Sequence, residues 1–196
     1  MRLTIFTTPI LSPLLKRFSI LVLRLAGWTL VGQMPANMPK SVVIAAPHTS
    51  NWDLPYTLMV AFALDLNIHW MGKIQIFRFP FNGLMRWLGG IAVDRSQSTN
   101  MVSASAQALR DADGELHLVV PPEGTRSQSR QWKTGFYYIA LQAQVPIVWG
   151  FLDFGSKTSG LGPALLPTGD LEADMASIKA FYAPFQGKNA SQFVID

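Results

Sequence analysis

Hydrophobic and polar residues follow two periods along this chain, and the period changes several times. Short runs of β-branched residues such as Val42-Val43-Ile44 predict buried strands, and apolar residues repeated every three or four positions predict helices. The predicted strands are 41–46, 68–72, 90–93, 116–120 and 145–151. The predicted helices are 54–65, 80–88, 98–111, 134–143 and 171–182, and the glycine-rich stretch 155–169 predicts a connection and a late strand.

Strands that alternate with helices predict an α/β fold: a single domain with a mostly parallel central sheet flanked by helices. The length of 196 residues suits one such domain, and no internal repeat is visible. Pro35 and Pro39 indicate an extended connection. We therefore divide the chain into residues 1–35, an N-terminal helix with its linker, and residues 36–196, the α/β domain.

The N-terminal segment predicts an amphipathic helix over residues 14–31. Its apolar residues recur at helical spacing, at Leu14, Phe18, Leu21, Leu25 and Trp28. Lys16, Arg17 and Arg24 interrupt the segment, so no uncharged run reaches the ~18–20 residues of a simple membrane-spanning helix, and a signal peptide fits poorly. Two interpretations remain: an interfacial helix that rests on a membrane, or a helix packed on the core of the domain.

Composition adds a surface argument. Hydrophobic residues make up 49% of the chain and charged residues only 14%, well below the ~25% of typical soluble domains, so part of the apolar surface should face something other than water. The net charge of +4 suits an anionic partner. The absence of cysteine excludes disulfides and thiolate ligands. The three histidines lack metal-ligand spacing, and no aromatic–basic interleaving indicates nucleic acid, so we expect no metal and no nucleic-acid partner.

An aromatic stretch, residues 77–88, has two interpretations. Phe77, Phe79 and Phe81 alternate with Arg78, Pro80 and Asn82, and further apolar residues follow. Core packing is the usual fate of such side chains. Three phenylalanines so close together are hard to bury in one small core, so a lipid-facing lip or a groove for an acyl chain is the other interpretation.

The loop after the first predicted strand contains His48 and Asp53, with four residues between them. Ligands of open α/β sheets bind at the carboxyl ends of strands. A carboxylate that accepts the Nδ1 proton of a histidine leaves Nε2 free to take a proton from a hydroxyl. His48 and Asp53 are therefore a candidate general base and its orienter. The alternatives are a surface histidine and a helix-capping aspartate.

Two more loops after predicted strands contain residues that suit anions. Arg95 follows strand 90–93, and Glu123-Gly124-Thr125-Arg126 follows strand 116–120. The arginine guanidinium matches phosphate oxygens, and a glycine lets the backbone approach a ligand closely. Together with His48 and Asp53, these side chains would converge on one edge of a parallel sheet. Taken singly, each arginine is equally an ordinary surface residue.

Four motifs together resemble the glycerolipid acyltransferase family, the group of 1-acylglycerol-3-phosphate and lysophospholipid acyltransferases. The matching segments stand in the order of that family and span residues 48–148: the histidine–aspartate block 48–53, the glycine–arginine block 90–95, Pro-Glu-Gly-Thr-Arg at 122–126 and the Val-Pro-Ile strand at 145–148. The chain departs from the pattern at Pro47, where many members have asparagine, and at Trp149, where a second proline is frequent. These departures bear on the acceptor and the subfamily.

The resemblance implies an acyltransferase domain over residues 36–196 and a direct mechanism without an acyl-enzyme. His48, oriented by Asp53, would deprotonate the hydroxyl of a lysolipid acceptor. Arg95 and Arg126, with N–H groups near Gly124, would bind its anionic head group, and Glu123 and Thr125 would shape the loop.

No bound cofactor is expected from this resemblance. The acyl donor would be acyl-CoA or acyl-carrier protein, and the enzyme would be peripheral or monotopic on the cytoplasmic face of the inner membrane. A transacylase that uses a phospholipid donor and a non-catalytic lipid-binding protein are the alternatives.

Overall fold

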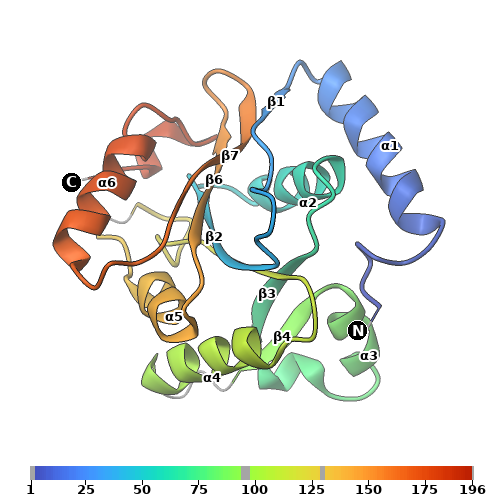
Figure 1. Cartoon of the computed structure of the whole chain (residues 1–196). Helices are drawn as coiled ribbons and strands as arrows, with labels where there is room; N and C mark the ends of the chain where they lie inside the picture. The colour runs from blue at the N-terminus through green and yellow to red at the C-terminus, as the bar shows by residue number, and fades with distance from the viewer. Residues whose placement is uncertain (1–2, 94–97, 129–130, 196) are drawn as a thin grey trace.

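The computed structural model of the chain describes residues 3–93, 98–128 and 131–195 (Figure 1). Helices α1 to α6 and strands β1 to β7 alternate over most of the chain. The helices are α1 (Leu11–Leu25), α2 (Asp53–Ala63), α3 (Asn82–Trp87), α4 (Ser98–Asp111), α5 (Gly135–Ala143) and α6 (Leu171–Tyr182), with short 3-10 turns η1 (Ile74–Phe77) and η2 (Ala190–Gln192). The strands are β1 (Thr29–Val31), β2 (Lys40–Ala46), β3 (Ile68–Lys73), β4 (Gly90–Val93), β5 (Leu116–Val120), β6 (Ile147–Asp153) and β7 (Thr158–Leu165).

All seven strands form one sheet in the order β1-β7-β6-β2-β5-β3-β4. Strands β6, β2, β5, β3 and β4 are parallel to one another, and β7 is antiparallel to β6. The prediction of an α/β fold with a mostly parallel sheet is confirmed. The five predicted strands are all present, and so is the late strand within residues 155–169.

The N-terminal helix differs from its prediction at both ends. It begins earlier, at Leu11, and it ends at Leu25 rather than at residue 31. Gly27 follows with φ of 79°, a left-handed conformation that stops a helix. Residues Thr29–Val31 form β1, which is parallel to β7. This pairing requires glycine at position 160, because a Cβ there would lie 1.8 Å from the carbonyl oxygen of Val31.

Strand β1 has a consequence for the proposed division of the chain at residue 35. The strand lies inside the segment 1–35, yet it is hydrogen-bonded to the sheet of the domain. The division therefore stays a prediction, and the N-terminal segment contributes an edge strand to the fold.

Alternate residues of the central strands enter opposite hydrophobic layers, because successive side chains of a strand point to opposite faces. Val42 and Ile44 of β2 pack in the larger cluster, which includes Leu109 of α4, Phe136 of α5 and Ile178 of α6. Val43 packs in the other cluster with Ala61 of α2. Helices α4, α5 and α6 thus cover one face of the sheet, and α2 covers the other (Figure 1).

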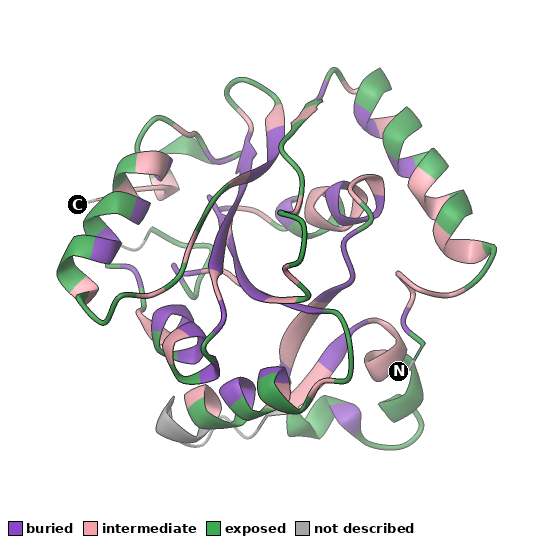
Figure 2. Ribbon diagram, in the orientation of Figure 1, coloured by how far each residue is buried: buried purple, intermediate pink, exposed green. Residues whose placement is uncertain are grey.

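Helix α1 packs against α2 by one face only. Leu23 and Ser19 are buried on that face, whereas the opposite face remains exposed (Figure 2). Its large exposed side chains are Leu14, Phe18, Ile20, Leu21 and Leu25. The two interpretations of this helix are therefore compatible, because it packs on the domain and still offers an apolar outer surface. Within the described residues, no helix combines the length and hydrophobicity needed to cross a bilayer.

The aromatic stretch, residues 77–88, also has a buried part and an exposed part. Phe77 is buried, but Phe79 is 96% exposed and Phe81 is 59% exposed. They stand beside further exposed apolar residues of η1 and α3. We call this group the lip: Ile74, Ile76, Phe79, Phe81 and Leu84. The lip begins in η1, which directly follows β3, and continues into α3, which leads to β4.

Candidate active site

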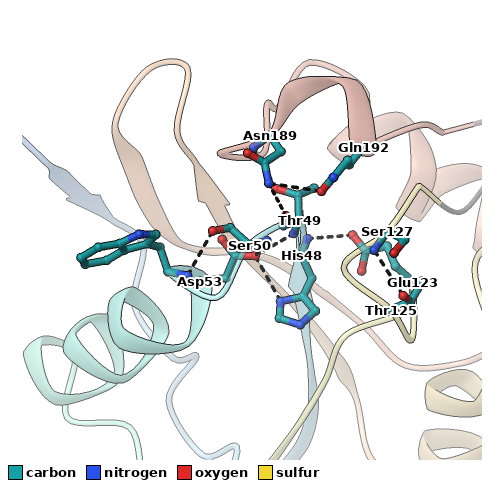
Figure 3. A network of polar contacts seen from close by, with 10 residues as sticks. His48, Thr49, Ser50, Asp53, Glu123, Thr125, Ser127, Asn189 and Gln192 are labelled. Carbon is teal, nitrogen blue, oxygen red and sulfur yellow. Dashed lines mark hydrogen bonds and ion pairs between the residues drawn. The ribbon is translucent and has the colours of Figure 1, made fainter.

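His48 and Asp53 face each other at the carboxyl end of β2, as predicted. The strand ends at Ala46, and Asp53 is the first residue of α2. The Nδ1 atom of His48 lies 3.2 Å from Oδ2 of Asp53 (Figure 3). The imidazole is partly exposed, with 26% of its side chain accessible, and the carboxylate is buried. The ring therefore turns Nδ1 toward the carboxylate and leaves Nε2 for a second partner.

The loop backbone fixes the Asp53 carboxylate. Its Oδ2 atom accepts hydrogen bonds from the backbone N–H groups of Thr49 and Ser50, both at 2.7 Å. This is not a helix cap, because the donors precede the helix and Asp53 itself lies in the first turn. Oδ1 is buried and has no hydrogen-bond partner among the described residues. The side chain is thus held in one orientation with respect to His48.

Glu123 connects the loop after β5 to the loop of His48. Its Oε1 atom accepts the backbone N–H of His48 at 2.9 Å. Oε2 is buried and finds no partner among the residues that the structure describes. Burial raises the pKa of the Glu123 carboxyl to about 7, although the hydrogen bonds from the backbone oppose that shift. The resemblance implied that Glu123 shapes its own loop, and its observed partner is the backbone of the His48 loop.

Three of the other predicted anion-binding residues, Gly124, Thr125 and Arg126, are exposed and directly follow Glu123. Gly124 has φ of 65°, and a Cβ there would lie 2.8 Å from the side chain of Lys133. Thr125 accepts the backbone N–H of Ser127 through Oγ1 at 3.2 Å. Arg126 is exposed, and no carboxylate of the described residues forms a salt bridge with it. Arg95 lies outside the described residues.

An apolar cavity of about 50 Å³ lies between α2 and the sheet. His48 and Asp53 line it together with apolar residues from the strands and from α2. Among the latter are Val43, Val60, Ala61, Ile68 and Leu161. The site thus combines a polar pair with an apolar cavity beside it.

A second histidine–carboxylate arrangement lies near the amino ends of the parallel strands β2 and β5. Nδ1 of His117 lies 2.8 Å from Ser41 Oγ, and Nε2 lies 3.3 Å from Glu115 Oε1. In a catalytic triad the serine faces Nε2 instead. Ser41 and His117 are fully buried, and burial lowers the pKa of His117. The group is therefore a buried polar network rather than a catalytic triad.

Sequence reasoning missed the contribution of the C-terminal residues. Asn189 donates from Nδ2 to the carbonyl oxygen of Thr49 at 2.8 Å, across 140 positions of sequence. No local pattern signals this contact. Within residues 3–93, 98–128 and 131–195, no three His, Cys, Asp or Glu side chains gather as metal ligands would.

Comparison with known proteins identifies a family. A model of the acyltransferase family matches residues 30–148. A probable 1-acyl-sn-glycerol-3-phosphate acyltransferase of Mycoplasma pneumoniae is 32% identical over 139 residues, which cover 67% of this chain and 52% of that protein. A 1-acyl-sn-glycerol-3-phosphate acyltransferase of Limnanthes douglasii is 27% identical over 133 residues, which cover 65% of this chain and 46% of that protein. The chain thus spans about half the length of these curated relatives.

A solved structure has a similar fold. The 1-acyl-sn-glycerophosphate acyltransferase of Thermotoga maritima superposes with a TM-score of 0.57 at 16% identity, covering 90% of this chain and 82% of that one. At this identity the likeness concerns the fold alone. The family model spans more than half of the chain and includes His48, Asp53 and the segment Glu123–Arg126. The chain belongs to the acyltransferase family.

Proposed function

We propose that this protein transfers a fatty acyl group from an acyl thioester to the hydroxyl of a lysophospholipid-like acceptor. One observation carries the proposal: His48 Nδ1 lies 3.2 Å from the buried carboxylate of Asp53, in a chain of the acyltransferase family. The names of the Mycoplasma and Limnanthes relatives favour 1-acylglycerol 3-phosphate as the first acceptor to test.

In the proposed mechanism His48 is the general base. Asp53 accepts a hydrogen bond from the Nδ1–H group, which leaves the Nε2 lone pair to remove the proton of the acceptor hydroxyl. The hydroxyl oxygen attacks the thioester carbonyl carbon and forms a tetrahedral intermediate. The intermediate collapses, the carbon–sulfur bond breaks, and the thiolate takes the proton back from Nε2. No protein side chain is acylated at any point.

The loop after β5 is the proposed site for the acceptor's anionic head group. Arg126 is exposed and without a carboxylate partner in the described part of the chain, which leaves its guanidinium free to bind a phosphate. Gly124 and Thr125 expose the backbone beside it. Glu123 ties this loop to His48, so a head group bound here would lie near the base. Arg95 is proposed as a second cation on sequence grounds.

The apolar cavity beside His48 is the proposed site for the start of the donor's hydrocarbon chain. Its lining is mostly apolar, and its polar residues are His48, Asp53, Thr57 and Ser159. An acyl chain that enters there would bring the thioester carbonyl next to the polar pair. The donor itself, acyl-CoA or acyl-carrier protein, is proposed as a co-substrate with no bound cofactor.

We further propose that the protein rests on an anionic membrane surface. Residues 1–93 contain eight Lys or Arg but only two acidic residues, Asp53 and Asp65. Asp53 is buried, and Asp65 pairs with Lys16. The same part of the chain supplies the exposed face of α1 and the lip. Basic charge beside exposed apolar side chains is typical of peripheral and monotopic proteins.

The proposed membrane surface would adjoin the site. The lip begins directly after β3, and His48 follows β2, so the start of the lip and His48 both lie at the carboxyl edge of the parallel strands. Helix α1 leads into β1 at this same edge, because β1 is antiparallel to β2. A lysolipid acceptor could then reach His48 from the bilayer. Both candidate thioester donors are cytoplasmic molecules, which favours the cytoplasmic face of the inner membrane.

The test is acyl transfer in detergent to a panel of lysolipid acceptors, followed as acylated acceptor for every donor and also as released thiol for the thioester donors. We expect His48→Ala to lower turnover ~10²–10⁴-fold, the usual contribution of a positioned general base. His69→Ala is the matched control, since His69 lies near the amino end of β3 and should be dispensable for turnover. Acyl-CoA, acyl-carrier protein and phospholipid donors are compared in parallel, because phospholipid turnover alone would identify a transacylase. Turnover indifferent to His48→Ala, or none with any donor, refutes the proposal.

A further inference from the structure

The chain that follows α6 crosses the carboxyl edge of the sheet and contacts the loop of His48. We call residues 186–192 the strap. Its first residue, Gln186, is anchored next to the end of β6: its N–H donates to Asp153 Oδ1 at 2.9 Å, and its carbonyl accepts the N–H of Phe154 at 2.8 Å. From there the strap reaches Thr49, as the contacts drawn for Asn189 and Gln192 in Figure 3 indicate.

Asn189 forms two hydrogen bonds with Thr49. Its side-chain Nδ2 donates to the Thr49 carbonyl oxygen at 2.8 Å, and its backbone N–H donates to Thr49 Oγ1 at 3.2 Å. Gly187 packs directly on the same threonine, since a Cβ at position 187 would lie 2.5 Å from Thr49 Oγ1. Thr49 is only 2% exposed. The strap therefore covers this residue and fixes both its main chain and its side chain.

Thr49 passes this constraint to the candidate catalytic pair. Its N–H is one of the two backbone donors to Asp53 Oδ2, at 2.7 Å, and that oxygen is the one that faces His48 Nδ1. The peptide plane of Thr49 thus sets where the carboxylate lies. Asn189 thus adds a restraint from a distant part of the chain to the one that Glu123 supplies through the His48 N–H.

The strap also reaches the loop proposed to bind the head group. With its nitrogen turned toward them, the Gln192 amide lies 2.7 Å from the Thr49 carbonyl oxygen and 2.8 Å from that of Arg126. The model of the acyltransferase family ends at residue 148. The strap therefore lies beyond the matched part of the chain and yet bridges two loops within it.

We propose that Asn189 is a positioning residue for the His48–Asp53 pair, and that the strap completes the active site from outside the family-matched part of the chain. This inference rests on the acyl transfer proposed above. Asn189 itself does not touch the reacting atoms. It acts by holding the Thr49 peptide, so its loss should slow the chemical step and leave substrate binding nearly unchanged.

The experiment measures kcat and KM for Asn189→Ala beside wild type. We expect kcat to fall roughly fivefold, the effect of losing one hydrogen bond, with the KM of donor and acceptor within about twofold. Asn189 is exposed, so the midpoint of thermal unfolding should change by less than about 4 °C. Gln107→Ala is the matched control, because Gln107 is an exposed amide that hydrogen-bonds Asp111 within α4.

A second variant and a second measurement make the result decisive. Gly187→Ala should lower kcat in the same way, because its new methyl group would displace Thr49. Amide hydrogen exchange of residues 48–53 should become faster in Asn189→Ala, while exchange in β2 stays the same. An unchanged kcat in Asn189→Ala, or a kcat loss matched by general unfolding, overturns the inference.

Failure of the proposed function is distinguishable from failure of this inference. If wild type lacks turnover with every donor, the proposed function and the catalytic role of Asn189 both fall, whatever the exchange rates are. If wild type turns over and Asn189→Ala has the same kcat, only the positioning role falls.

Discussion

The buried carboxyl of Glu123 predicts a specific pH dependence of stability. Burial raises its pKa from 4.5 to about 7 in the folded protein. The folded state therefore binds this proton more tightly than the unfolded state does. The stabilisation is fully present below pH 4.5 and is lost as the pH rises through 7. A shift of this size corresponds to roughly 3 kcal/mol of unfolding free energy.

Glu123→Gln removes the titration with little change in shape. The amide oxygen can still accept the N–H of His48, the bond that measures 2.9 Å in the native site. Urea unfolding at pH 5, 6, 7 and 8 gives the free energy of unfolding of each protein. We expect wild type to lose stability relative to Glu123→Gln over this range, by an amount on the order of 3 kcal/mol.

A control separates this carboxyl from the others. Glu172 is exposed on α6, so Glu172→Gln should follow the pH dependence of wild type. If the wild-type and Glu123→Gln curves run parallel from pH 5 to 8, the carboxyl is not buried as described, and the reasoning fails.

Three further outcomes are expected. Replacing both Phe79 and Phe81 with serine should weaken binding to anionic vesicles at least tenfold, since burying one phenylalanine contributes roughly 1.5–3 kcal/mol. Vesicle sedimentation measures the binding. Leu166, which is 62% exposed, is the control, and an equal loss in Leu166→Ser would contradict a membrane-binding role of the lip. Arg126→Ala should raise the KM of a phosphate-bearing acceptor about 10-fold or more and change kcat little, because charge-assisted hydrogen bonds contribute ~1.5–3 kcal/mol. An unchanged KM would exclude Arg126 from the head-group site. Gly124→Ala should lower the free energy of unfolding by about 1–2 kcal/mol, because φ is 65° there; an unchanged urea midpoint would argue against that conformation.

Local patterns predicted most of the fold. Val42, Val43 and Ile44 form a buried central strand because a parallel sheet is covered on both faces, and such a strand reads as a continuous apolar run. Strand β1 could not be found this way. It has three residues, and its pairing depends on Gly160, more than a hundred positions later. A short edge strand is defined by its partner rather than by its own sequence.

In the candidate site, too, local contacts were predictable and long-range contacts were not. The spacing of His48 and Asp53 predicted their contact, because His48 lies in the short loop after β2 and Asp53 begins the helix that follows that loop. The bond from the His48 N–H to Glu123 and the bonds from Asn189 to Thr49 join segments that only the sheet brings together. Neither periodicity nor a motif encodes such partners in a single sequence.

The strap also bears on how the protein matures during synthesis. Thr49 meets Asn189 across 140 positions, so this closure is among the most non-local contacts of the fold. A ribosome delivers β2 and its loop long before residues 186–192 emerge, and contacts of such separation form late. The emerging chain can therefore assemble its central strands first and gain a fully ordered His48 loop only after residues 186–192 have emerged. Ordering of the His48 loop would then report that the α/β domain has been synthesised through its strap.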